Sequence, residues 1–206
     1  MTGAIGSFSA MAVAGREVAI DLDTFEIMTY RSLIGLVIVC TFALIFRTQN
    51  QISTDRFGLH FLRNLAHFAG QNLWFYALTL IPFAQLFAFE FSVPMWVMLA
   101  APFLLGEQLT RIRVTSVLVG FIGILIVTRP WSAGLEPGII AAALSAIGFA
   151  ATSIFTKKLT ATATITCIMF WLTSMQLVFG LIGAGYDGDI ALPTSTSLPW
   201  VILIGL

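Results

Sequence analysis

Long apolar runs separated by short polar segments extend over the whole chain. They predict helices over residues 27–46, 61–80, 82–105, 114–128, 137–156 and 165–184. Most of these runs approach or exceed the roughly 20 residues that a helix needs to cross a bilayer. Residues 1–14 form a shorter apolar run, and a last one begins at Leu198. The pattern predicts an all-α polytopic membrane protein with seven to eight transmembrane helices.

Composition supports this class and excludes others. The 206 residues are 58% hydrophobic and 10% charged, whereas a soluble domain carries about 25% charged residues. Continuous apolar runs also differ from the alternating segments of a membrane β-barrel. The net charge is zero, which gives no reason to expect nucleic-acid binding.

Candidate catalytic and metal-binding patterns are not found in the sequence. The two cysteines, Cys40 and Cys167, both lie inside apolar runs, where cysteine behaves as a small packing residue. Neither has cysteine or histidine neighbours at ligand spacing. Clustered nucleophile, base or metal-ligand motifs do not occur, so we expect no enzyme activity, no cofactor and no metal.

The segment from Pro82 to Pro130 has the most distinctive order of features. A first apolar run ends in Leu105-Gly106-Glu107, and a second contains Gly120-Phe121-Ile122-Gly123. Pro94 cannot donate to the carbonyl of Glu90, which predicts a bend in the first helix. This hairpin resembles the fourth and fifth helices of an EamA-type half of the drug/metabolite transporter superfamily.

The resemblance implies a fold of ten helices in two inverted five-helix repeats. Residues 1–130 are then the first repeat, with its first helix short of its start, and residues 137–206 are part of the second. Ala4-Ile5-Gly6 recurs as Ala146-Ile147-Gly148, which agrees with an internal repeat. Inverted repeats are typical of secondary transporters. We therefore expect a fragment of a longer protein that contains seven to eight of the ten helices.

Lysine and arginine are distributed unevenly between alternate loops and helix ends. Cytoplasmic loops of membrane proteins carry an excess of these residues. The richer side predicts that the N-terminus is cytoplasmic. We expect the chain in the cell inner (plasma) membrane. The richer side holds Arg47, Arg56, Arg63, Arg111, Arg113, Lys157 and Lys158, against Arg16, Arg31 and Arg129 on the other side.

Glu90 is the carboxylate placed inside an expected span. A charged and unpaired carboxylate at that depth costs about 2.5 kcal/mol or more. One interpretation is a group that binds a proton or a substrate amine in a cavity. The alternative is a neutral carboxylic acid that is hydrogen-bonded within the helix bundle.

Polar residues also form a stripe on the helix expected over 61–80. Arg63, His67, Gln71 and Trp74 follow one another at spacings of four, four and three residues, which places them on one helical face. Such a face avoids lipid, so the stripe is a candidate substrate-lining surface that shares a water-filled cavity with Glu90. Alternatively, Arg63 extends to the membrane interface and His67 is a structural histidine.

Two further residues follow from the resemblance. Arg31 matches a basic position of the family and is a candidate for gating or substrate contact, with extension to the outer interface as the alternative. Glu107 matches the loop glutamate of the family. It is expected to be structural, by capping a helix end or by pairing with Arg111 or Arg113.

The function these features favour is secondary transport of a small organic metabolite by alternating access, with proton coupling as one option. The combination of Arg63, Glu90 and aromatic residues favours a zwitterionic or aromatic solute. The expected partners are this solute and the lipid bilayer, and a homodimer is left open. The alternative is a non-transporting membrane scaffold or an inactive truncated remnant.

Overall fold

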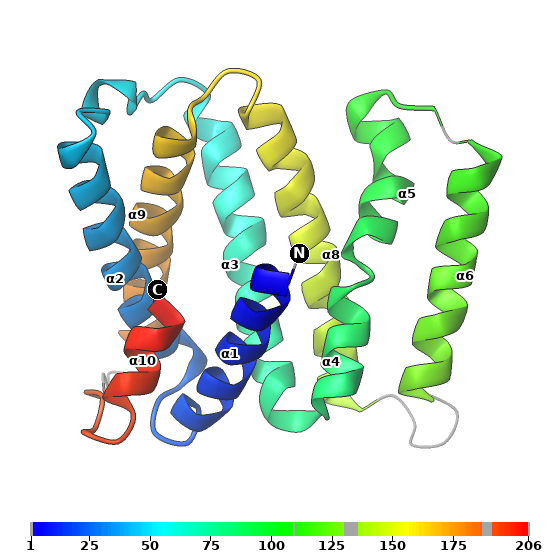
Figure 1. Cartoon of the computed structure of the whole chain (residues 1–206), viewed down its shortest axis with the longest axis horizontal. Coiled ribbons are helices and arrows are strands. Elements are labelled where there is room, and N and C mark those ends of the chain that lie inside the picture. Colours follow the sequence, from blue (N-terminus) through cyan, green and yellow to red (C-terminus); the bar gives the residue numbers. More distant parts are fainter. Residues whose placement is uncertain (1, 109, 130–135, 187–190, 206) are drawn as a thin grey trace. The chain divides into compact units, whose positions relative to one another are not determined.

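The structure, a computed structural model of the whole chain, describes residues 2–108, 110–129, 136–186 and 191–205. Helices account for most of the described part (Figure 1). They are α1 (Thr2–Val18), α2 (Thr24–Ile45), η1 (Gln49–Gln51), α3 (Phe57–Leu80), α4 (Phe83–Glu90), α5 (Val93–Leu105), α6 (Arg111–Thr128), α8 (Pro137–Leu159), α9 (Ile165–Ala184) and α10 (Leu198–Gly205).

The helices have the lengths and apolarity of membrane spans. Five spans in the described part of the chain are long and apolar enough to cross a membrane, with α4 and α5 counted together. They are Thr24–Ile45, Phe83–Leu105, Arg111–Thr128, Pro137–Leu159 and Ile165–Ala184. The fold is thus an all-helical membrane protein, as the apolar runs predicted.

The predicted helix over 82–105 is broken. α4 ends at Glu90 and α5 begins at Val93, with Pro94 in its first turn. Because proline has no amide N–H, the helical ladder cannot run through this point. The carbonyl of Ser92 instead accepts hydrogen bonds from the amides of Met95 and Trp96, which starts α5. The bend predicted from Pro94 is confirmed.

The start of α3 differs from the prediction. Helix was expected from residue 61, but it begins at Phe57. The first turn therefore includes His60, whose side chain is fully buried. Polar residues in residues 47–60 made this turn resemble a loop.

Contacts divide the chain into two compact units. The first contains residues 1–64 and 159–206, and the second contains residues 65–158. In the first unit, α2 packs along α9, and α10 packs on α1 and α2. At Gly180, an added Cβ would lie 3.1 Å from the backbone nitrogen of Thr29, so glycine allows α9 to approach α2 closely.

The first unit also holds the segment before α10 against the start of α2. Asp23 and Glu26 form a capping box, with their side chains accepting from each other's backbone amides. The other carboxylate oxygen of Glu26 accepts from the amide of Ala191. Tyr30 donates its hydroxyl to the Ala191 carbonyl at 2.8 Å. The buried Glu26 side chain therefore has a structural explanation.

The second unit packs the rest of α3 with α4, α5, α6 and α8. A Cβ at Gly148 would lie 3.0 Å from the Cα of Gly70 and 3.1 Å from the carbonyl oxygen of Ala66. α8 therefore lies directly against the α3 backbone, as small residues in membrane helices permit. Ala142, Ala146 and Ala150 of α8 are buried. Large apolar side chains of α6 are exposed, including Val119 and Ile126, as expected for a lipid-facing helix.

Candidate solute site and polar clusters

Glu90 and Trp74 meet in the second unit. The break at residues 81–82 is so short that α3 and α4 fold back as antiparallel neighbours. Trp74 of α3 is 2% exposed, and its indole Nε1 donates to Glu90 Oε2 at 3.1 Å. An ionised carboxylate has about four acceptor positions, so this single neutral donor leaves Glu90 with capacity for a proton or a cationic group.

Aromatic residues are neighbours of this pair along the chain. The ring of Phe75 lies edge-on to Trp74, with centroids 5.2 Å apart. On α4 and at its C-cap, Phe83, Phe87 and Phe91 follow one another with centroid separations of 6.2 and 6.4 Å. The carboxylate therefore ends a helix that carries three phenylalanines, Phe83, Phe87 and Phe89.

Two more members of the predicted stripe lie on the same part of α3. Gln71 is buried. The imidazole of His67 stacks at a tilt on Phe149 of α8, with centroids 5.9 Å apart. Both interpretations of His67 stay predictions.

Arg63 belongs to the first unit and takes part in a polar network. Its guanidinium donates to Asn64 Oδ1 at 2.8 Å, and both side chains are buried. The Asn64 amide donates to the Trp171 carbonyl at 3.1 Å, while Gln176 Nε2 donates to the Asn64 carbonyl at 3.0 Å. This network ties α3 to α9.

Sequence reasoning did not single out this network. The available signal was that Asn64 and Gln176 are amides in largely apolar helices, which predicts hydrogen bonding but not the partner. His60 was also missed, because it was assigned to a loop. Its imidazole is fully buried, and neither ring nitrogen has a hydrogen-bond partner among the described residues.

Arg31 lies on α2 in the first unit and is partly exposed. Its neighbour Tyr30 bonds to Ala191. Metal binding has no support in the part of the chain that the structure describes, where no group of three histidine, cysteine or acidic side chains is suitably placed.

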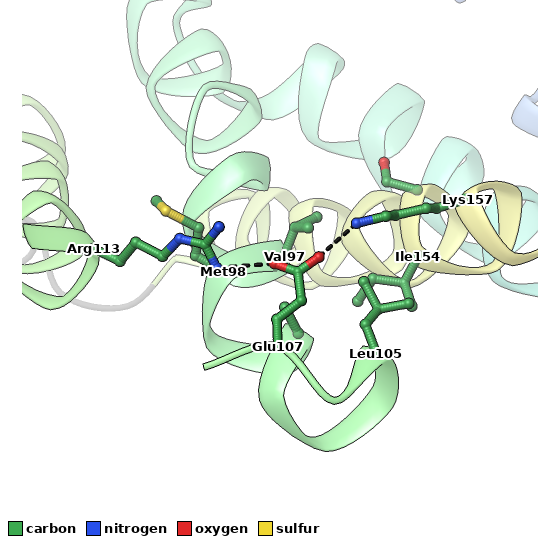
Figure 2. Close-up of a pocket in the computed structure, with 9 residues that line it drawn as sticks. Val97, Met98, Leu105, Glu107, Arg113, Ile154 and Lys157 are labelled. Carbon is green, nitrogen blue, oxygen red and sulfur yellow. Dashed lines mark hydrogen bonds and ion pairs between the residues drawn. The ribbon is translucent and has the colours of Figure 1, made fainter. Parts of the chain in front are cut away.

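Glu107 follows the turn at the end of α5. Gly106 adopts a left-handed conformation with φ of 68°, which glycine accepts without strain. Glu107 then accepts from Arg113 Nη1 at 2.9 Å and from Lys157 Nζ at 2.5 Å (Figure 2). Hydrogen bonds from Lys157 and Arg113 lower the pKa of the Glu107 carboxyl below its usual value.

The pair between Glu107 and Arg113 confirms one of the two predicted partners. Lys157, on α8, was not predicted. Together the two cations connect the turn between α5 and α6 with the end of α8.

Two cavities are formed within the second unit. One of about 210 Å³ lies beside Glu107, Arg113 and Lys157. The other, of about 320 Å³, has an almost entirely apolar lining from α4, α5, α6 and α8. Of its hydroxyl groups, that of Ser92 donates to the carbonyl of Phe89 in α4, and that of Thr128 donates to the carbonyl of Ile124 in α6. Neither lining includes Glu90, so the water-filled cavity expected around Glu90 stays a prediction.

Comparison with known proteins identifies the family of this chain. A profile of the EamA-like transporter family matches residues 1–129, which is more than half of the chain. The chain belongs to the EamA-like transporter family.

Curated relatives of this chain are named as transporters. An S-adenosylmethionine uptake transporter from Rickettsia felis is 29% identical over 175 residues, covering 85% of this chain and 59% of the relative. A riboflavin transporter from Brucella anthropi is 36% identical over 126 residues, covering 61% of this chain and 44% of the relative. The chain therefore spans less than two thirds of the length of these relatives.

A solved crystal structure supports the fold. It matches 100% of this chain and 74% of its own chain, with a TM-score of 0.66 at 18% identity. This likeness shows a shared helical fold.

Proposed function

We propose that this chain is a secondary transporter of a small organic metabolite that works by alternating access, with Glu90 as the group that binds a proton or a cationic part of the solute. The observation that carries the proposal is the bond between Glu90 and Trp74 at the break between α4 and α5. Membership of a transporter family and relatives named for metabolite transport support it.

The chemistry of the pair favours a cationic group over a neutral one. Broken helices at membrane depth are typical places for substrate and ion sites in secondary transporters. A carboxylate there is costly unless a cation or a proton offsets its charge. The adjoining aromatic rings provide apolar surface and π-faces that attract cations.

The names of the relatives suggest two test compounds that differ in charge. S-adenosylmethionine carries positive charge at its sulfonium and amine groups, whereas riboflavin is uncharged at neutral pH. The proposal favours the first as a solute class, because riboflavin gives a carboxylate no charge to balance.

The test is uptake of radiolabelled S-adenosylmethionine and riboflavin into proteoliposomes that contain the full chain. Glu90→Gln keeps an oxygen that accepts from Trp74 but removes the charge. We expect it to abolish uptake of the cationic compound. Glu17→Gln is the control, because Glu17 is exposed near the end of α1. Unchanged uptake in Glu90→Gln would refute the role of Glu90.

The same assay addresses the alternative of a non-transporting scaffold. A folded chain that takes up neither compound, nor releases either from preloaded vesicles, in a pH gradient of either direction would favour that alternative. Trp74→Phe separates positioning from charge. We expect it to weaken apparent affinity for the cationic solute while retaining its uptake at saturating concentration.

We further propose that the N-terminus is cytoplasmic, as the distribution of lysine and arginine predicts. Attaching green fluorescent protein to residue 1 tests this orientation, because the protein fluoresces on the cytoplasmic side. Fluorescence of the fusion supports the proposal, and its absence with a correctly inserted chain opposes it.

A further inference from the structure

Positive charge is concentrated at one end of the second unit. α6 begins with Arg111 and Arg113, α8 ends with Lys157 and Lys158, and the contact between Glu107 and Lys157 brings these helix ends together. Four cations and one carboxylate give this end a net charge of +3 among the residues that the structure describes.

A pocket of about 210 Å³ lies within this charged end (Figure 2). Its polar lining consists of Glu107, Arg113, Ser153 and Lys157. The rest of its lining is apolar and comes from α5 and α8: Val97, Met98, Ala101, Leu105 and Ile154. The pocket therefore combines cationic groups with hydrocarbon walls.

Arg113 keeps hydrogen-bonding capacity toward a ligand. Arg113 uses Nη1 in its bonds to Glu107 and to the Gln108 carbonyl, and a guanidinium has five N–H donors in a fixed fork. Glu107 balances only one of the two lining cations. The remaining charge and the planar fork suit a phosphate group.

We propose that this pocket binds the headgroup of an anionic phospholipid, with the phosphate on Arg113 and Lys157 and the first part of an acyl chain against the apolar walls. α5, α6 and α8 belong to candidate membrane spans, so their ends lie where headgroups lie. Basic pockets between membrane helices bind such headgroups. A free phosphate would gain nothing from the apolar walls, which favours the lipid.

The experiment measures lipid binding by the full chain purified in neutral detergent. Phosphatidylglycerol and phosphatidylcholine of the same acyl composition are added in turn, and bound lipid is counted by native mass spectrometry. For each variant, the amount of bound phosphatidylglycerol is divided by the amount of bound phosphatidylcholine. A general loss of stability affects both amounts and therefore cancels in this ratio. We expect the unchanged chain to retain phosphatidylglycerol in preference to phosphatidylcholine.

Matched pairs of variants locate the site. Arg113→Gln and Lys157→Gln remove charges that line the pocket, whereas Arg111→Gln and Lys158→Gln remove the same charges from residues outside its lining. The preference should fall at least about tenfold in the first pair, as expected for losing a charged hydrogen bond. It should fall less than about threefold in the second pair, where only exposed charge is removed.

A further variant tests the pocket without changing charge or the Glu107 ion pairs. Ala101→Leu adds side-chain volume at the lining and should reduce the lipid preference as the first pair does. An equal loss of preference in all four charge variants would mean diffuse surface attraction and would overturn the proposal. Competition by millimolar inorganic phosphate that removes the bound lipid would overturn the lipid assignment in favour of a soluble phosphate.

Discussion

Substituting Gly148 by alanine should lower the stability of the chain more than substituting a glycine elsewhere in the same unit. A Cβ there would lie 3.0 Å from the Cα of Gly70, 3.1 Å from the carbonyl oxygen of Ala66 and 3.2 Å from the nitrogen of Gly70. All three atoms belong to the α3 backbone, so no side chain can rotate to relieve the contact. α8 would have to move away from α3 by a few tenths of an ångström.

The matched control is Gly123 of α6, where an added Cβ would meet nothing within 4 Å. Both alanine variants gain about 1 kcal/mol of helix propensity over glycine. Gly148→Ala also carries an overpacking cost of about 1–3 kcal/mol. The free energy of unfolding should therefore be about 1–3 kcal/mol lower for Gly148→Ala than for Gly123→Ala.

The measurement is reversible unfolding in mixed micelles with increasing dodecyl sulfate, followed by tryptophan fluorescence. The chain has five tryptophans, and neither substitution touches one of them. Equal stability of the two variants, or a more stable Gly148→Ala, would refute the close approach of α8 to α3.

Three other predictions concern polar contacts. At a pH above 4.5, the ordinary pKa of a glutamate carboxyl, Glu107→Gln should have a lower melting temperature than the unchanged chain. Lys157 and Arg113 lower the pKa of Glu107 in the folded chain, so the stabilisation by Glu107 is lost as the pH falls through that lowered pKa. A difference in melting temperature between the variant and the unchanged chain that persists at such a low pH, or in high salt, would contradict the prediction. Glu26→Ala leaves the backbone amides of Asp23 and Ala191 without their acceptor and should cost about 1–3 kcal/mol more than Glu17→Ala in the unfolding assay. Asn64→Leu should destabilise more than Asn72→Leu, because Asn72 bonds only within its own helix; equal effects would mean the α3–α9 network adds no stability.

Much of the helix pattern could be predicted from the sequence, because a bilayer requires long apolar runs. The break at residues 91–92 was also predictable, since Pro94 removes one donor at a known position. The first turn of α3 was not, because its polar residue, His60, is buried beside Trp171 of α9 rather than exposed to water. The division into two compact units depends on contacts between residues 1–64 and 159–206, which no local pattern contains.

The same distinction holds for the polar clusters. Glu90 and Trp74 are 16 residues apart on two helices joined by a tight break, so their proximity follows from the hairpin. Glu107 and Lys157 are 50 residues apart, and Asn64 and Gln176 are 112 apart. A sequence shows that such groups need partners, but the packing of distant helices decides which partners they find.

The two carboxylates at the ends of α4 and α5 have opposite surroundings, and this difference separates their roles. Glu107 lies outside the helices with two cationic partners, an arrangement in which the charge supports the fold. Glu90 is the last residue of α4, within a candidate span, and the described contacts give it only a neutral indole donor. A charge on Glu90 would therefore work against stability, whereas the charge on Glu107 favours it. This difference supports our proposal that a proton or a cationic solute offsets the charge of Glu90.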